Sequence, residues 1–180
     1  GKGVPAALYM AKLGSDMRTL AFTEKGPAKA LAKLNDLLVE RSRRGMFATL
    51  LYLELDSREG RITISNAGHL SPIIKKTDGS VARLATAGGS PLGILAGMTF
   101  GEESLVIGRG DTVILYTDGI VEAMNAREDL DGYERVEALV RKTASDPLIM
   151  KTAIIEDVNR FTGLSPQHDD MTLVCFGAVP

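Results

Sequence analysis

The chain has 180 residues, of which 44% are hydrophobic, and its formal net charge is −2. This length and hydrophobic content predict one globular domain over residues 1–180 rather than a disordered tail. The small net charge gives no electrostatic case for binding nucleic acid, and no apolar run is long enough for membrane insertion. The single cysteine, Cys175, excludes an internal disulfide and fits a reducing compartment, so we expect a cytoplasmic location.

Two helices are predicted at the beginning of the chain. Pro5 suits a first helical turn, and the mostly apolar run 6–22 continues it. After the break at Gly26-Pro27, an apolar stripe of helical period predicts an amphipathic helix over 28–43. Gly45 is placed to end it.

The pattern then changes to the alternation that is typical of strands. A strand over 49–55 and a second at 62–64 predict a hairpin through the turn at Arg58-Glu59-Gly60. Strands over 72–77 and 81–85 predict another hairpin, because Asp78-Gly79 between them is favoured in tight turns.

The remaining elements define the fold class. We expect strands 103–107 and 112–117 to pair with each other around Gly108-Arg109-Gly110. Helices over 133–143 and 147–161 follow, and then a final strand over 171–176. Short successive strands with helices grouped at both ends predict an α+β domain, with two mainly antiparallel sheets packed together and helices outside.

Two of these strands carry carboxylates at one tip. The strand that begins at Thr112 runs into Thr117-Asp118-Gly119, and the final strand follows Asp169 and Asp170. Both strands are apolar on both faces, which indicates central positions in a sheet. Antiparallel pairing would bring Asp118 and Asp169 to one edge, where their oxygens suit a divalent cation. Each acidic segment also reads as an ordinary polar turn, since Asp-Gly is common in turns.

Other polar residues have more than one interpretation. His168 is a metal ligand, a partner that orients a carboxylate, or a solvated side chain. Asn66 and His69 belong to a glycine-containing loop that either only connects strands or shapes the rim of the same site. The chain lacks the motifs of a phosphate-binding glycine loop, a cysteine phosphatase and a serine hydrolase. Metal-activated water is therefore the chemistry that remains.

Taken in order, these motifs resemble the SpoIIE/RsbU-like branch of the PP2C (PPM) family of metal-dependent protein serine/threonine phosphatases. The resemblance covers nearly the whole chain. It is carried by Gly1-Lys2-Gly3-Val4-Pro5-Ala6-Ala7-Leu8, Phe47-Ala48-Thr49-Leu50, Asn66-Ala67-Gly68-His69, Pro91-Leu92-Gly93, residues 110–123 and His168-Asp169-Asp170-Met171-Thr172-Leu173.

The resemblance implies an α-β-β-α sandwich with a two-metal Mn²⁺ or Mg²⁺ centre. It assigns metal binding to Asp118 and Asp169 and a supporting position to Asp170. Two metals about 4 Å apart would activate a water for direct attack on phosphorus, without a phosphoenzyme. The implied site rim consists of Gly119, Asn66, His69, Gly1, Lys2 and Gly3.

The chain departs from the family pattern at its first residues. That pattern reads Asp-x-x-Gly-(His/Lys)-Gly, and the chain begins at its first glycine, Gly1. We therefore expect a truncated domain that lacks the Asp bridging both metals and a further acidic motif upstream. For residues 1–180 alone we expect little or no activity and weak metal occupancy.

The resemblance implies a bacterial-type phosphatase that hydrolyses phosphoserine or phosphothreonine on a regulatory protein. A phosphorylated anti-anti-sigma factor is a candidate substrate, and a sensor or receiver domain is expected upstream. The alternative is a non-catalytic domain of the same fold that binds a phosphoprotein or another partner. An Asp three residues before Gly1 would favour catalysis, and a replacement there would favour binding.

Overall fold

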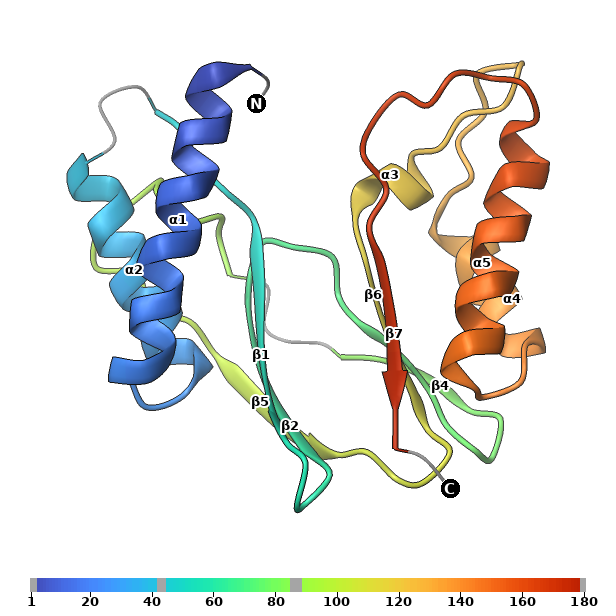
Figure 1. The fold of residues 1–180 in the computed structure, drawn as a ribbon, viewed down its shortest axis with the longest axis horizontal. Coiled ribbons are helices and arrows are strands. Elements are labelled where there is room, and N and C mark those ends of the chain that lie inside the picture. Colours follow the sequence, from blue (N-terminus) through green and yellow to red (C-terminus); the bar gives the residue numbers. More distant parts are fainter. Residues whose placement is uncertain (1–2, 42–44, 85–88, 179–180) are drawn as a thin grey trace. The chain divides into compact units, whose positions relative to one another are not determined.

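The computed structural model describes residues 3–41, 45–84 and 89–178. The chain divides into two compact units, one formed by Gly1–His69 with Ala85–Leu105 and the other by Leu70–Leu84 with Val106–Pro180. Each unit has one antiparallel sheet and its own helices (Figure 1). The α+β class with two antiparallel sheets is thus confirmed, while the expectation of a single domain stays a prediction.

The sheet of the first unit has three strands in the order β1-β2-β5. Their bounds are Leu50–Asp56 for β1, Arg61–Ala67 for β2 and Glu102–Val106 for β5. The predicted hairpin of β1 and β2 is confirmed, with Asp56 opposite Arg61. Asp56 Oδ1 accepts hydrogen bonds from the N–H groups of Arg58 and Glu59, which closes the turn.

The helices of the first unit are α1, Val4–Thr23, and α2, Pro27–Arg41. Helix α2 packs on the sheet and α1 packs on α2 (Figure 1). The apolar stripe of α2 is buried, as its pattern predicted, except for the half-buried Leu37. It forms a core with residues from the sheet and loops: Leu31, Leu34, Leu38, Ala67, Leu92 and Phe100. No helix in the described part of the chain is long and apolar enough to cross a membrane.

The sheet of the second unit has four strands in the order β4-β3-β6-β7. Their bounds are Ile73–Lys75 for β3, Val81–Arg83 for β4, Thr112–Tyr116 for β6 and Leu173–Gly177 for β7. All neighbouring strands are antiparallel, and the hairpin of β3 and β4 is confirmed. Gly79 in its turn has a φ of 89°, which suits glycine better than other residues.

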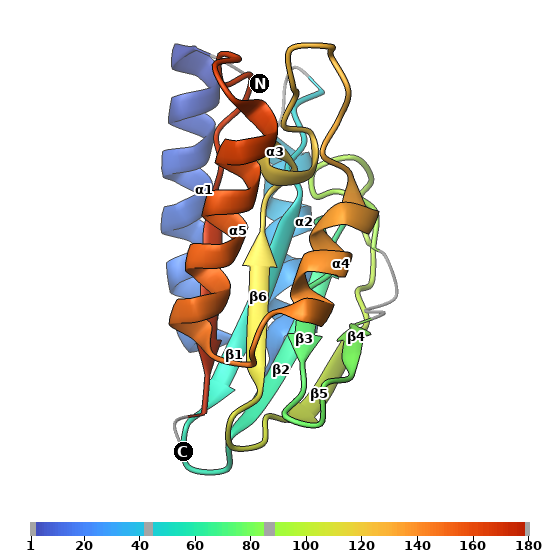
Figure 2. The same cartoon turned by 90° about the vertical axis from the view of Figure 1, so that its right-hand side faces the viewer.

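The described residues of the second unit form the helices α3, Asp118–Val121, α4, Tyr133–Lys142, and α5, Pro147–Thr162. Helices α4 and α5 lie over one face of the sheet (Figure 2). Asp146 begins α5, because its Oδ1 accepts from the N–H groups of Leu148 and Ile149. The core between helices and sheet contains Ile73, Ile114, Ile120, Val121, Val140, Met150 and Ile154.

The predicted pairing of strands 103–107 and 112–117 is wrong. Strand β5 pairs with β2, whereas β6 lies between β3 and β7. The side chains of β5 alternate between exposed and half-buried, which suits an edge strand. Those of β6 are buried on both faces, so β6 needs a neighbour on each side.

The turn between β5 and β6 is fixed by Asp111 rather than by a hairpin. Its Oδ2 accepts from the N–H of Gly108 at 2.9 Å and from Lys76 Nζ at 2.8 Å. Its Oδ1 accepts from the N–H of Thr77 at 3.0 Å. These bonds hold the turn against the β3–β4 hairpin. Together they also lower the pKa of the Asp111 carboxyl, although burial alone would raise it.

The central position predicted for the final strand is also wrong. Strand β7 stands at the end of the sheet order in the described part of the chain. Val174 in this strand is 47% exposed. The apolar run at 171–176 matched a central strand in composition, but composition does not determine how many partners a strand finds.

Candidate metal centre

The ends of β6 and β7 are joined just beyond the last pair of strand residues. Tyr116 lies opposite Leu173, so the predicted antiparallel pairing of these two strands is confirmed. The next residue, Thr117, donates its N–H to the Thr172 carbonyl at 3.1 Å. Thr117 Oγ1 accepts from the N–H of Thr172 at 2.9 Å and donates to the Asp170 carbonyl at 3.2 Å. The segment that leads to Asp118 is therefore bonded to the segment that follows Asp169.

Helix α3 places Asp118 at the surface. Asp118 is the first residue of the helix and is exposed, whereas Ile120 and Val121 are buried in the core of the second unit. The sequence pattern had an ordinary turn as its alternative interpretation here, and it did not predict a helix. The apolar pair Ile120 and Val121 after Asp118-Gly119 was the sequence signal for this helix, because their burial in the core holds the short helix in place.

Gly119 allows α3 to lie directly against the loop that contains Asp169. A Cβ at this position would lie 2.5 Å from the Asp170 carbonyl oxygen and 3.4 Å from the Asp169 carbonyl oxygen. Real Cβ atoms essentially never approach another atom as closely as 2.5 Å. Any side chain at residue 119 would therefore separate the two segments.

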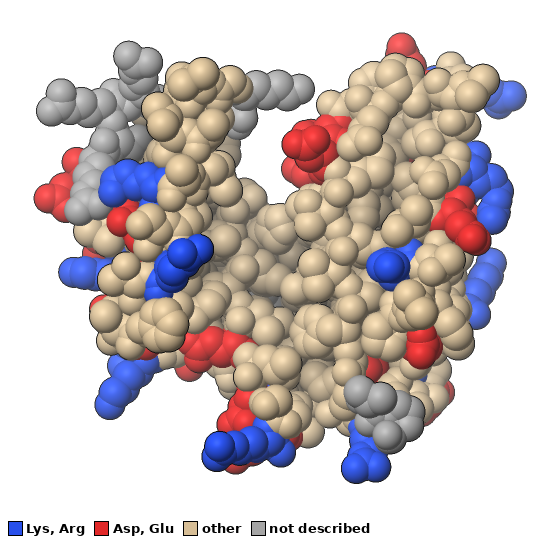
Figure 3. All heavy atoms as spheres, viewed as in Figure 1, with Lys and Arg blue, Asp and Glu red and all other residues tan. Residues whose placement is uncertain are grey.

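The two carboxylates have similar local contacts. Asp118 Oδ1 accepts from the N–H of Gly119 at 3.0 Å, and Asp169 Oδ1 accepts from the N–H of Asp170 at 2.8 Å. Both residues are exposed. Acidic side chains gather on this part of the second unit, where β6 runs into α3 (Figure 3). Within the described residues, neither carboxylate has a Lys or Arg partner.

The donor type fits a divalent metal ion. Carboxylate oxygens are the hard ligands that Mg²⁺ and Mn²⁺ prefer, and one oxygen of each carboxylate has no partner among the described residues. Residues 3–41, 45–84 and 89–178 contain no group of three or more His, Cys, Asp and Glu side chains that is placed to hold a metal. Asp118 and Asp169 are thus candidate ligands, and their binding of a metal stays a prediction.

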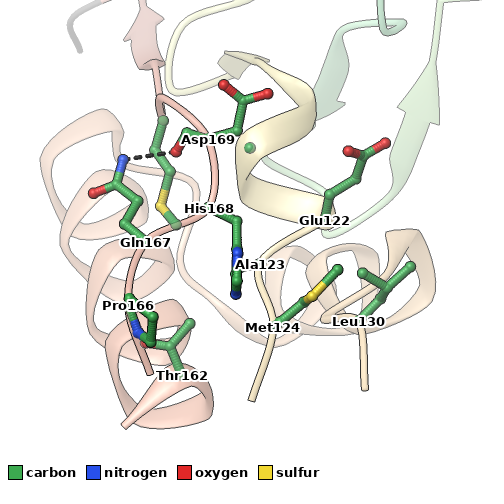
Figure 4. A pocket seen from close by; sticks show the side chains of 11 residues that line it. Glu122, Ala123, Met124, Leu130, Thr162, Pro166, Gln167, His168 and Asp169 are labelled. Carbon is green, nitrogen blue, oxygen red and sulfur yellow. Dashed lines mark hydrogen bonds between the residues drawn. The ribbon is translucent and has the colours of Figure 1, made fainter. Parts of the chain in front are cut away.

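Asp170 and His168, the neighbours of Asp169 in the loop before β7, have different surroundings from Asp169. The backbone of Asp170 connects Asp169 to Thr117 through the hydrogen bonds given above. The supporting role assigned to the Asp170 side chain stays a prediction. The ring of His168 points away from the Asp169 carboxylate, into a pocket (Figure 4).

Asn66, His69 and Gly3 belong to the first unit, and their place at the site rim stays a prediction. Asn66 is buried and closes its own loop: Asn66 Nδ2 donates to the His69 carbonyl at 2.9 Å, and Asn66 Oδ1 accepts from the N–H of His69 at 2.8 Å. Gly3 precedes α1 with a φ of 83°. Gly1 and Lys2 lie outside the described residues.

A pocket of about 290 Å³ adjoins the candidate metal centre and was not predicted from the sequence. Its walls come from the segment after α3, from the end of α5 and from the loop before β7 (Figure 4). The residues that line it are Gly119, Glu122, Ala123, Met124, Leu130, Thr162, Pro166, Gln167, His168, Asp169 and Met171. The apolar residues soon after Asp118 were its only sequence signal.

Solved structures of PP2C domains have the same fold as this chain. The RsbU and RsbW domains of Rv1364c from Mycobacterium tuberculosis match with a TM-score of 0.80 and 25% identity, over 100% of this chain and 50% of that one. The SiaA-PP2C domain of Pseudomonas aeruginosa matches with a TM-score of 0.82 and 22% identity, over 98% of this chain and 72% of that one. The fold is therefore that of a PP2C domain.

The sequence comparisons define the branch of the PP2C phosphatases to which the chain belongs. The family model described as "Stage II sporulation protein E (SpoIIE)" matches residues 1–178. Phosphoserine phosphatase RsbU of Bacillus subtilis (strain 168) is 25% identical over 174 residues, which are 97% of this chain and 52% of RsbU. The chain spans about half or less of the length of the curated relatives that it matches. This chain belongs to the SpoIIE family, in the SpoIIE/RsbU-like branch of the PP2C phosphatases.

Proposed function

We propose that the chain is the catalytic region of a metal-dependent protein phosphatase that acts on phosphoserine or phosphothreonine. One observation carries the proposal: Asp118 and Asp169, in a chain of this family, lie on two segments that Thr117 and Gly119 hold together. Two exposed carboxylates on segments that are bonded together, without a cationic partner among the described residues, suit a divalent cation better than a structural ion pair.

The residues would act by holding and orienting the metal. Asp118 and Asp169 would each offer the oxygen that is not bonded to the following N–H group. Mn²⁺ or Mg²⁺ bound there would supply an activated water and neutralise charge on the phosphoryl oxygens. Further ligands would come from water, from the phosphate and from groups outside the described residues. The hydrogen bonds of the Thr117 hydroxyl to the backbone of Asp170 and Thr172 would hold the segments of the two carboxylates together.

The substrate proposed is a phosphorylated regulatory protein, and an anti-anti-sigma factor is the first candidate. The support is the similarity to RsbU, which is described as a phosphoserine phosphatase. A sensor or receiver domain on the same polypeptide is proposed as the source of regulation, and the cytoplasm as the location. A phosphoprotein-binding role without catalysis is the outcome to be excluded.

The test is Mn²⁺-dependent release of phosphate from a phosphoserine protein by the whole protein, with Asp118→Asn and Asp169→Asn as variants. Loss of one metal-binding carboxylate is expected to lower kcat/KM by about 100-fold or more, on the scale of removing one major electrostatic contact to the transition state. The matched control is Asp78→Asn in the exposed β3–β4 turn, where an Asn side-chain oxygen still accepts from the N–H of Ser80, and it is expected to keep wild-type activity.

The result separates the two functions. Full activity in both site variants would show that the metal-site assignment is wrong. Binding of the phosphoprotein by the wild type, without release of phosphate at any Mn²⁺ concentration, would establish the non-catalytic alternative instead.

A further inference from the structure

The pocket beside Asp169 has a preformed outer wall. Met124 and Leu130 form an isolated antiparallel bridge, and the segment between them is closed by bonds from the N–H of Asn125 to the Asp129 carbonyl and from the N–H of Glu128 to the Asn125 carbonyl. The N–H of Asp131 also donates to the Ala123 carbonyl at 2.8 Å. A wall that is ordered before binding costs little entropy when a ligand arrives.

The opposite wall is held in place by contacts within its own loop. Gln167 Nε2 donates to the Asp169 carbonyl at 2.7 Å, and the N–H of Ser165 donates to the Thr162 carbonyl at 3.0 Å. The ring of His168 lies between this wall and Met124 (Figure 4). Asp169 therefore borders both the candidate metal centre and the pocket.

The size and lining of the pocket indicate what it can hold. Its volume of about 290 Å³ is at the lower limit for a small-molecule site, so it suits one side chain better than a whole metabolite. Met124, Leu130 and Met171 offer apolar surface, and Leu130 is 52% exposed. Methionine adapts to differently shaped apolar partners. The carboxylates of Glu122 and Asp169 disfavour an acidic occupant.

We infer that this pocket binds an apolar side chain of the phosphoprotein substrate, two residues from the phosphorylated serine. The inference rests on the proposed function, which places the phosphoryl group at Asp118 and Asp169. In an extended segment, alternate side chains point to the same face and are on the order of 7 Å apart. A substrate that presents its phosphoserine to the metal centre then presents the second residue along to the pocket that shares Asp169 with it.

The experiment uses the whole protein and three phosphoserine peptides that differ only in having Leu, Ala or Asp at both positions two residues from the phosphoserine. Binding is measured by fluorescence anisotropy with Ca²⁺ in place of Mn²⁺, because without a metal the two carboxylates would repel the phosphoserine. The kcat/KM is measured with Mn²⁺. We expect the Leu peptide to exceed the Asp peptide by roughly tenfold in both measurements, the scale of burying part of a leucine side chain.

Leu130→Ser is the test variant, and it is expected to reduce this preference to less than about threefold, on the same scale. Leu148→Ser is the matched control, because Leu148 is an equally large residue of the same unit, 66% exposed on α5 and outside the pocket. It is expected to keep the wild-type preference. Because the readout is a ratio between peptides, a general loss of folded protein does not change it.

Two results would overturn the inference: equal binding of all three peptides by the wild type, or an unchanged preference for Leu in Leu130→Ser. The preference without any Mn²⁺-dependent release of phosphate would support the pocket and refute the proposed catalytic function. Mn²⁺-dependent release of phosphate without a preference for the Leu peptide would support the proposed catalytic function and refute the role of the pocket.

Discussion

Replacing Gly119 by alanine tests whether close contact between α3 and the 169–170 loop builds the site. The added Cβ would lie 2.5 Å from the Asp170 carbonyl oxygen, about 0.9 Å short of ordinary van der Waals contact. Overpacking of this kind typically costs about 1–3 kcal/mol, and the better helix propensity of alanine returns up to about 1 kcal/mol. We therefore expect the free energy of unfolding to fall by roughly 1–2 kcal/mol.

The same substitution should also lower the rate of phosphate release, and by more than the loss of folded protein explains. A displacement near 1 Å of one carboxylate relative to the other costs on the order of 100-fold in rate when geometry limits the reaction. We expect kcat/KM for phosphate release by the whole protein to decrease by about 10- to 100-fold in Gly119→Ala under conditions where the variant is folded.

The matched control for this substitution is Gly14→Ala. Gly14 lies within α1, and a Cβ there would meet nothing within 4 Å. It should raise the free energy of unfolding by about 0.5–1 kcal/mol. Urea unfolding and Mn²⁺-dependent phosphate release are measured on both variants. Wild-type stability together with wild-type activity in Gly119→Ala would refute the reasoning, because the clash would then have been absorbed without moving the loop.

Two further predictions concern pH and metal. Burial raises the pKa of Asp131 to about 6, against the effect of Arg135, whose Nε lies 2.6 Å from Asp131 Oδ1. The folded state then holds this proton more tightly than the unfolded state. The group's contribution to the free energy of unfolding should fall by about 2 kcal/mol between pH 4 and pH 7, and Asp131→Asn should remove this part of the decline in urea unfolding. A difference between wild type and variant that does not change with pH would contradict this. For residues 1–180 alone, we expect weak Mn²⁺ binding by calorimetry and little phosphate release, whereas an N-terminally extended chain should show both; robust turnover by residues 1–180 would show the prediction to be wrong.

The elements that the sequence predicted well are those with a local cause. The apolar stripe of α2 and the turn at Asp78-Gly79 depend on residues within a few positions of each other. The carboxylates at the tips of the strands were likewise visible as Asp118 and Asp169, because a strand that ends in a polar turn has a recognisable pattern. Motif order then connected them with a family that the comparisons confirm.

The partner of strand β5 could not be obtained in this way. Residues 103–107 and 112–117 are neighbours in sequence with a glycine-rich turn between them, yet Asp111 bonds that turn to the β3–β4 hairpin and β5 pairs with β2. The free energy that decides between such pairings comes from side chains distant in sequence, and a short window contains none of them.

The chain by itself determined which residues are available for metal chemistry, because hard carboxylate ligands and their place after apolar strands are properties of the sequence. Tertiary structure decided how they are held. The bonds of Thr117 and the missing side chain at Gly119 join segments about 50 residues apart, and the pocket bounded by Leu130 and His168 exists only where they meet. Close packing depends on the positions of atoms in space, which residue types alone do not specify.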